Sequence, residues 1–174
     1  MLTNPEDAYD LLRHLGAPGR LLQHLRLVGE AADGLIAAYR DLGVECDERL
    51  IRLGVAVHDA GKVLHPDELD GPGSLHEQAG QALMLANGVP PEVAKSCVSH
   101  AAWDRVDATF EERTVALADK LWKGKREPEL ELLVVDGAAA RLSTERWDIF
   151  ERLDTVFEEI AAGGDERLRR SRLI

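Results

Sequence analysis

Apolar residues recur every three to four positions along most of the chain, the spacing of helices that bury one face. The clearest apolar stripe lies within residues 18–43 and consists of Leu21, Leu25, Val28, Ala32, Leu35 and Tyr39. No alternation typical of strands extends over a useful length. The short apolar run at 132–135 has no second strand to pair with, so a helix is favoured there. The pattern predicts an all-α fold.

Capping and helix-breaking residues divide this pattern into segments. The predicted helices cover about residues 5–15, 18–42, 48–60, 75–87, 90–102, 109–123, 128–142 and 144–163. Gly61 is the expected stop of the third helix, and Ser74 with Glu77 forms a capping-box pattern before the fourth. Residues 62–74 hold two prolines and two glycines and are expected to form a loop.

Composition narrows the class of protein. The chain has 174 residues, of which 45% are apolar, enough for one domain with one core. We expect this domain to cover residues 1–165. The remaining residues, 166–174, contain four arginines and are expected to be a charged, solvent-exposed or frayed tail.

Charge and cysteine content limit the partners and the compartment. The net charge of -11 disfavours long nucleic acids as partners. The two cysteines, Cys46 and Cys97, lie in helical segments outside any C-x-x-C, which favours free thiols. No apolar run approaches the roughly 20 residues of a membrane span, and the first residues lack the pattern of a signal peptide. These features predict a cytoplasmic protein without membrane contact.

Several polar residues fall on or beside apolar helix faces. They are His24, His58, Asp59, His76, His100 and Asp119, from five predicted helices. An unpartnered polar group in a core costs roughly 2–7 kcal/mol, and a charge costs more. A single such histidine is ordinarily a hydrogen-bonded core residue. One partner that serves all six is a metal centre, because imidazole nitrogen and carboxylate oxygen suit first-row transition metals.

The sequence around these residues resembles the HD superfamily. His58-Asp59-Ala60-Gly61-Lys62 carries the motif, with His24 upstream and Asp119 downstream in Ala118-Asp119-Lys120. The resemblance covers about residues 20–125 and implies an HD-type helical bundle, with additional C-terminal helices at 126–163. It also implies that the residues matching His24, His58, Asp59 and Asp119 bind one metal ion. Ala60 departs from the family, in which many members carry a larger aliphatic residue.

Two further histidines extend this resemblance. HD proteins with two more histidines between the HD motif and the last Asp bind a second ion, and His76 and His100 match these positions. The resemblance then implies that Asp59 bridges two metals. The alternative is one metal, with His76 and His100 as pocket residues. The metal stays open among Fe, Mn, Co, Ni, Zn and Mg.

The resemblance implies a metal-dependent phosphohydrolase acting on a small phosphorylated molecule such as a nucleotide. Two metals about 3.5–4 Å apart can acidify a water for attack on phosphorus. Asp59 would then act as a catalytic ligand, and Lys62 as a point charge that binds phosphate. One alternative is a mixed-valent diiron oxygenase, which uses the same four His and two Asp. Another is a metal-stabilised nucleotide-binding regulatory module. The C-terminal helices could form an oligomer interface.

Overall fold

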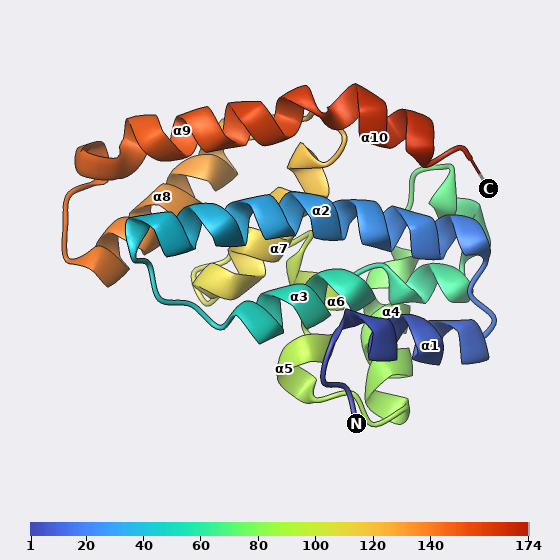
Figure 1. Ribbon diagram of the computed structural model, residues 1–174. Coiled ribbons are helices and arrows are strands. Elements are labelled where there is room, and N and C mark those ends of the chain that lie inside the picture. The colour runs from blue at the N-terminus through green and yellow to red at the C-terminus, as the bar shows by residue number, and fades with distance from the viewer. Residues whose placement is uncertain (174) are drawn as a thin grey trace.

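The computed structural model describes residues 1–173, and these residues form helices and short loops without any strand (Figure 1). The α-helices are α1 (Pro5–His14), α2 (Gly19–Leu42), α3 (Glu48–Val57), α4 (Leu75–Ala86), α5 (Pro91–Ala94), α6 (Ser96–Ser99), α7 (Phe110–Leu121), α8 (Pro128–Leu142), α9 (Arg146–Ala162) and α10 (Gly164–Arg170). Two 3-10 turns, η1 (Ala60–Val63) and η2 (Pro66–Leu69), connect α3 to α4. The predicted all-α fold is confirmed.

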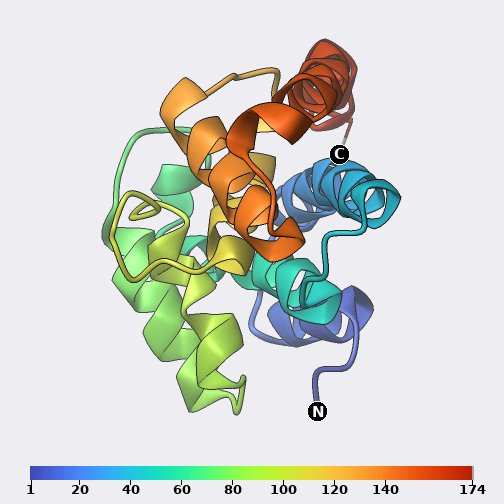
Figure 2. The same ribbon diagram turned by 90° about the vertical axis from the view of Figure 1, so that its left-hand side faces the viewer.

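The long helix α2 runs through the middle of the molecule. Figure 1 shows α9 and α10 along one side of it and α1 and α3 along the other. In Figure 2 the green segment that contains α4 to α6 lies away from the red C-terminal helices. Buried residues of α2 accordingly belong to two apolar clusters. Leu35 and Tyr39 pack in the cluster shared with α7, α8 and α9, whereas Leu21 and Leu25 pack in the cluster shared with α1, α3 and α5.

Most predicted helix ends are found where the capping residues indicate them. The side chain of Asn4 accepts a hydrogen bond from the N–H of Asp7 at 3.2 Å and so begins α1. Gly43 ends α2 in the left-handed conformation, with φ of 79°. Thr109 begins α7 by accepting from the N–H of Glu112 at 3.1 Å. No helix within residues 1–173 is long and apolar enough to cross a membrane.

The third predicted helix ends earlier than expected. The helix α3 ends at Val57, and His58 and Asp59 follow in the turn that leads into η1. Gly61 does not have a positive φ, so it is not a left-handed helix end. Instead, a Cβ at Gly61 would lie 1.8 Å from the carbonyl oxygen of His76. Glycine is needed here because the backbones of η1 and α4 approach each other closely.

The predicted capping box of Ser74 and Glu77 is wrong. Ser74 precedes α4, but its side chain makes no capping hydrogen bond. The carboxylate of Glu68, carried by η2, accepts hydrogen bonds from the N–H groups of Leu75 and His76, each at 3.0 Å. Residues 62–74 are therefore an ordered connection that supplies the cap of α4 from a distance in sequence.

Two other segments also differ from the prediction. The helix expected over 90–102 is divided at Lys95 into α5 and α6. The expected frayed tail is instead helical as far as Arg170. The guanidinium of Arg167 donates to the carbonyl oxygens of Trp122 and Ile160 at 3.0 and 2.9 Å. These bonds dock α10 onto the end of α7, and the charge pattern of the tail does not reveal them.

Candidate metal centre

Five helical elements bring imidazole and carboxylate groups to one largely buried point. The contributing elements are α2, the end of α3, α4, the end of α6, and α7. Their side chains form two groups whose ligand atoms lie within 4.8 Å of one another: His24, His58, Asp59 and Asp119 in the first, and Asp59, His76 and His100 in the second. All six residues singled out in the sequence are thus brought together, and Asp59 belongs to both groups.

The two carboxylate oxygens of Asp59 face different groups. Oδ2 lies 2.9 Å from Nε2 of His24 and 3.6 Å from Nε2 of His58. Oδ1 lies 3.3 Å from Nε2 of His76 and 3.6 Å from Nε2 of His100. Asp59 is only 3% exposed, so water does not compete freely for these oxygens. The carboxylate therefore lies between two separate sets of imidazoles.

The separations match the edges of a metal coordination sphere. Two ligand atoms that are each about 2.1 Å from one ion lie roughly 3 to 3.5 Å apart. Nε2 of His58 lies 3.2 Å from Oδ1 of Asp119, within this range. The contacts of His58 and His100 with Asp59, both 3.6 Å, lie slightly above this range and are too long to be good hydrogen bonds. The donor set and its spacing fit a cation better than a purely hydrogen-bonded core.

Two of the histidines are oriented by backbone carbonyls. Nδ1 of His58 lies 2.7 Å from the carbonyl oxygen of Val55, and Nδ1 of His100 lies 2.9 Å from that of Ser96. An imidazole that donates its Nδ1–H presents Nε2 with a free lone pair, which is the form that binds a metal. Both Nε2 atoms face Asp59, so the local turns present these rings as ligands.

The third oriented histidine depends on Glu68, a residue that the sequence analysis missed. Oε2 of Glu68 lies 2.5 Å from Nδ1 of His76, whose Nε2 faces Asp59. Glu68 is 9% exposed and belongs to η2, inside the segment expected to be a loop. Helical periodicity gives no signal for such a residue. A carboxylate behind a ligand histidine fixes the ring and raises its basicity.

The cluster carries a surplus of negative charge. The carboxylates of Asp59, Asp119 and Glu68 meet one ammonium group, that of Lys62, whose Nζ lies 2.9 Å from Oδ2 of Asp59. With neutral imidazoles, two negative charges are uncompensated in a largely buried place. Buried charge of one sign is costly unless it is paired or coordinates a metal. A divalent cation is a suitable counter-charge.

The pKa values follow from the same surplus. Burial lowers the pKa of His58, but the carboxylates of Asp59 and Asp119 outweigh burial and raise this pKa to about 9. Burial raises the pKa of Asp119, but the neighbouring His58 imidazole holds it below its ordinary value. Burial and His58 lower the pKa of His100. Without a metal, the carboxylates of Asp59 and Asp119 thus favour a proton on the His58 ring.

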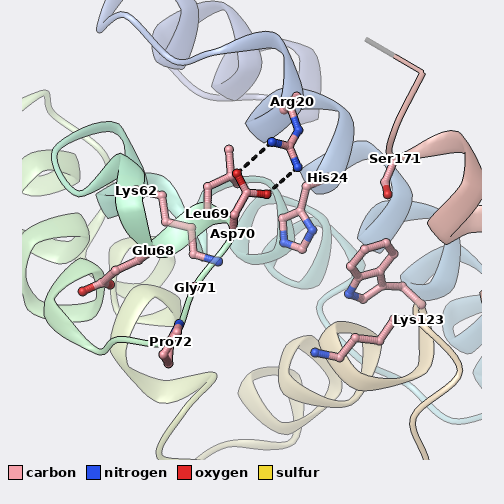
Figure 3. A pocket seen from close by; sticks show the side chains of 11 residues that line it. Arg20, His24, Lys62, Glu68, Leu69, Asp70, Gly71, Pro72, Lys123 and Ser171 are labelled. Atoms are coloured by element: carbon pink, nitrogen blue, oxygen red, sulfur yellow. Dashed lines mark hydrogen bonds and ion pairs between the residues drawn. The ribbon is translucent and has the colours of Figure 1, made fainter.

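A cavity of about 500 Å³ opens beside the cluster (Figure 3). Lys62, which contacts Asp59, and Lys123 line opposite sides of the cavity, and His24 and Trp122 also line it. The Trp122 ring is buried, as expected for a core residue, and stands edge-on to His24 with ring centres 4.9 Å apart. A small molecule in this cavity would therefore reach the first ligand group directly.

Fold and centre together define a class of protein: a helical domain that gathers His and Asp side chains from separate helices into a largely buried cluster that could hold metal ions. The HD domain family matches residues 21–123, more than half of the chain, and the chain belongs to this family. HD domains are typical of metal-dependent hydrolases. No curated protein and no solved structure matches the chain significantly. The family match contains all six ligand candidates and Lys62, and α8 to α10 lie beyond it.

Proposed function

We propose that the protein is a phosphohydrolase that uses two divalent metal ions to hydrolyse a phosphoester bond of a small phosphorylated molecule such as a nucleotide. The observation that carries this proposal is the division of the Asp59 carboxylate, with one oxygen toward each ligand group. When bound, the two ions supply an acidified water and neutralise phosphate charge.

Each of the two ligand groups would hold one metal ion. His24, His58 and Asp119 would hold one ion together with Oδ2 of Asp59, and His76 and His100 would hold the other with Oδ1. Four imidazoles favour a first-row transition ion over Mg²⁺, which prefers oxygen ligands. The protein's own contribution is to hold these ligands in place before substrate arrives.

Lys62 supplies the positive charge closest to the reaction. Its side chain is 14% exposed and lines the cavity, and its ammonium contacts the same Asp59 oxygen as His24 does. A phosphate oxygen that enters the cavity beside the ions can accept a hydrogen bond from this ammonium.

The acidic surface elsewhere disfavours long nucleic acids as substrates. The two free cysteines fit a reducing compartment, and we propose the cytoplasm.

The test is phosphate release by protein that is stripped of metal and reloaded with one ion at a time. We expect hydrolysis of some members of a panel of phosphomonoesters and nucleotides with at least one of Mn²⁺, Fe²⁺, Co²⁺, Ni²⁺ or Zn²⁺. Asp59→Asn should remove nearly all turnover and most of the bound metal. Asp41→Asn, which changes an exposed aspartate of α2, is the matched control.

Other outcomes would replace the proposal. Oxygen consumption by the iron-loaded protein without phosphate release would assign the diiron oxygenase instead. Binding of phosphorylated ligands without turnover, unchanged in Asp59→Asn, would assign a regulatory binding module.

A further inference from the structure

We infer that the substrate carries two phosphoryl groups, of which one lies at the metal cluster and the other is held at the opposite wall of the cavity by Lys123. This inference rests on the proposed function, because both groups occupy the same cavity. It assigns a binding role to a residue at the edge of the family match, beside helices that lie outside the match.

The cavity has two walls of different origin. His24 and Lys62 belong to the cluster wall. The opposite wall comes from Lys123, two residues after α7, and from Ser171, which follows α10, while Trp122 lies against His24. Figure 3 shows the side chains of Lys62 and Lys123 extending toward the space between them from opposite sides. A cavity of about 500 Å³ is large enough for a small-molecule ligand that touches both walls.

Among the side chains that line the cavity, cations outnumber carboxylates, although the chain as a whole and the cluster beside the cavity are negative. The chain has a net charge of -11, yet its three cavity cations face two carboxylates that are already engaged. The carboxylate of Glu68 is bound to His76. The carboxylate of Asp70 forms a double ion pair with Arg20, at 2.5 and 2.8 Å.

Lys123 is therefore the cavity cation without a counter-charge. Within residues 1–173 no carboxylate lies at ion-pairing distance from its ammonium, whereas Lys62 contacts Asp59 and Arg20 contacts Asp70. Lys123 is solvent-exposed, so its ammonium is free to pair with an anion that enters the cavity. Because Lys62 serves the cluster end, the anion at Lys123 is a second group on the ligand.

The indole of Trp122 lines the cavity beside His24 and precedes Lys123 in the sequence. Its Nε1–H is buried and has no acceptor within residues 1–173. A buried donor without an acceptor is costly. Phosphoryl oxygens only accept hydrogen bonds, so they complement the ammonium of Lys123. This chemistry favours a second phosphoryl group over an apolar or cationic one.

The test compares alkanediol bisphosphates of increasing chain length with the matching alkyl monophosphates, using the metal-loaded protein. We expect a higher kcat/KM for bisphosphates of suitable length. In Lys123→Met, the ratio of kcat/KM for bisphosphate to that for monophosphate should fall about ten- to hundred-fold, the loss typical of one charged hydrogen bond. Lys125→Met, two residues further on and exposed, should leave the ratio unchanged.

Binding of alkane bisphosphonates, which cannot be hydrolysed, tests the inference without turnover. By calorimetry, the wild type should bind them more tightly than alkyl phosphonates, and Lys123→Met should lose this preference. The inference would be overturned if the bisphosphate-to-monophosphate ratio of kcat/KM were the same in the wild type and in Lys123→Met. Equal affinity of the wild type for bisphosphonates and for alkyl phosphonates would also overturn it. So would an alkyl phosphate with a carboxylate at its other end, if its kcat/KM equalled that of the bisphosphate of the same length. If wild type hydrolyses no phosphoester, the proposed function fails, and the binding measurement still decides the second site.

Discussion

The two walls of the cavity differ in how completely their polar groups are paired. At the cluster, the side chains contact one another although negative charge is in excess: Nδ1 of His76 is held by Glu68, and Lys62 contacts Asp59. Beyond the cluster, the Nε1–H of Trp122 and the ammonium of Lys123 have no protein partner within residues 1–173. Paired groups are fixed in advance and suit a reaction centre, whereas unpaired groups leave hydrogen bonds for a ligand. The proposed reaction and the proposed binding of a second phosphoryl group thus involve different sides of one cavity.

Gly61→Ala should have the largest effect, because it acts on the whole cluster at once. The added Cβ would lie 1.8 Å from the carbonyl oxygen of His76, so η1 and α4 must separate. This movement would pull Asp59 away from His76. We expect loss of bound metal, loss of activity and a lower melting temperature. Gly29→Ala is the control, since its Cβ meets nothing closer than 3.8 Å, and it should be neutral or stabilising. Retention of both ions in Gly61→Ala would contradict the account of this close approach.

Glu68→Gln should weaken only one of the two ions. The change removes the carboxylate charge behind His76 and leaves His24, His58 and Asp119 untouched. Loss of such a supporting group typically costs about ten- to hundred-fold in metal affinity. A metal titration followed by calorimetry should show one weakened and one unchanged phase. Glu77→Gln, on the adjacent position of α4, should leave both phases as they are in the wild type.

Metal affinity should rise with pH up to about 9. In the metal-free protein the pKa of His58 is raised from 6.5 to about 9, so at neutral pH an incoming ion must displace a proton. Each such proton makes the affinity increase by about tenfold per pH unit. The same proton stabilises the metal-free fold below pH 6.5, and this contribution is lost as the pH rises through about 9. Calorimetry in buffers of different ionisation enthalpy should detect the released proton; binding without proton release would contradict the charge surplus.

Arg167→Ala should have the smallest effect of these substitutions. It should disturb the packing of α10 near Lys123 and leave the metal cluster unchanged. The change removes two hydrogen bonds to the carbonyl oxygens of Trp122 and Ile160. We expect a loss of about 1–3 kcal/mol in the free energy of unfolding, with bound metal retained. Arg169→Ala, whose side chain pairs with Glu166 at the surface, should cost less. Loss of metal in Arg167→Ala would show that metal binding at the cluster depends on the packing of α10 at the other side of the cavity.

Three members of the cluster could be predicted from helical spacing, and His58, Asp59 and His100, which follow helix ends, from the resemblance around the His58-Asp59 motif. His24, His76 and Asp119 each occupy an apolar face at helical spacing, and the structure brings all of them to Asp59. Lys62 follows from the motif and lies beside the same carboxylate. Local periodicity is sufficient here, since a helix fixes the direction of each side chain relative to its buried stripe.

The remaining features depend on contacts between segments that are not regular. Glu68 comes from a 3-10 turn and reaches His76 across a connection without helical spacing. Gly61 is required by the backbone of a neighbouring helix, which no pattern around Gly61 encodes. The wall at Lys123 is completed by α10, whose docking depends on Arg167 bonding to backbone carbonyls. Capping and periodicity rules use only residues close in sequence, so they do not predict these tertiary contacts.

The central claim is that Asp59 bridges two ions, and anomalous X-ray scattering from a metal-loaded crystal tests it most directly. The account predicts two anomalous peaks about 3.5–4 Å apart. One should lie among Oδ2 of Asp59 and the first ligand group, and the other between Oδ1 and the two imidazoles of His76 and His100. A single peak, or a cluster without any peak in protein loaded to saturation, would contradict it.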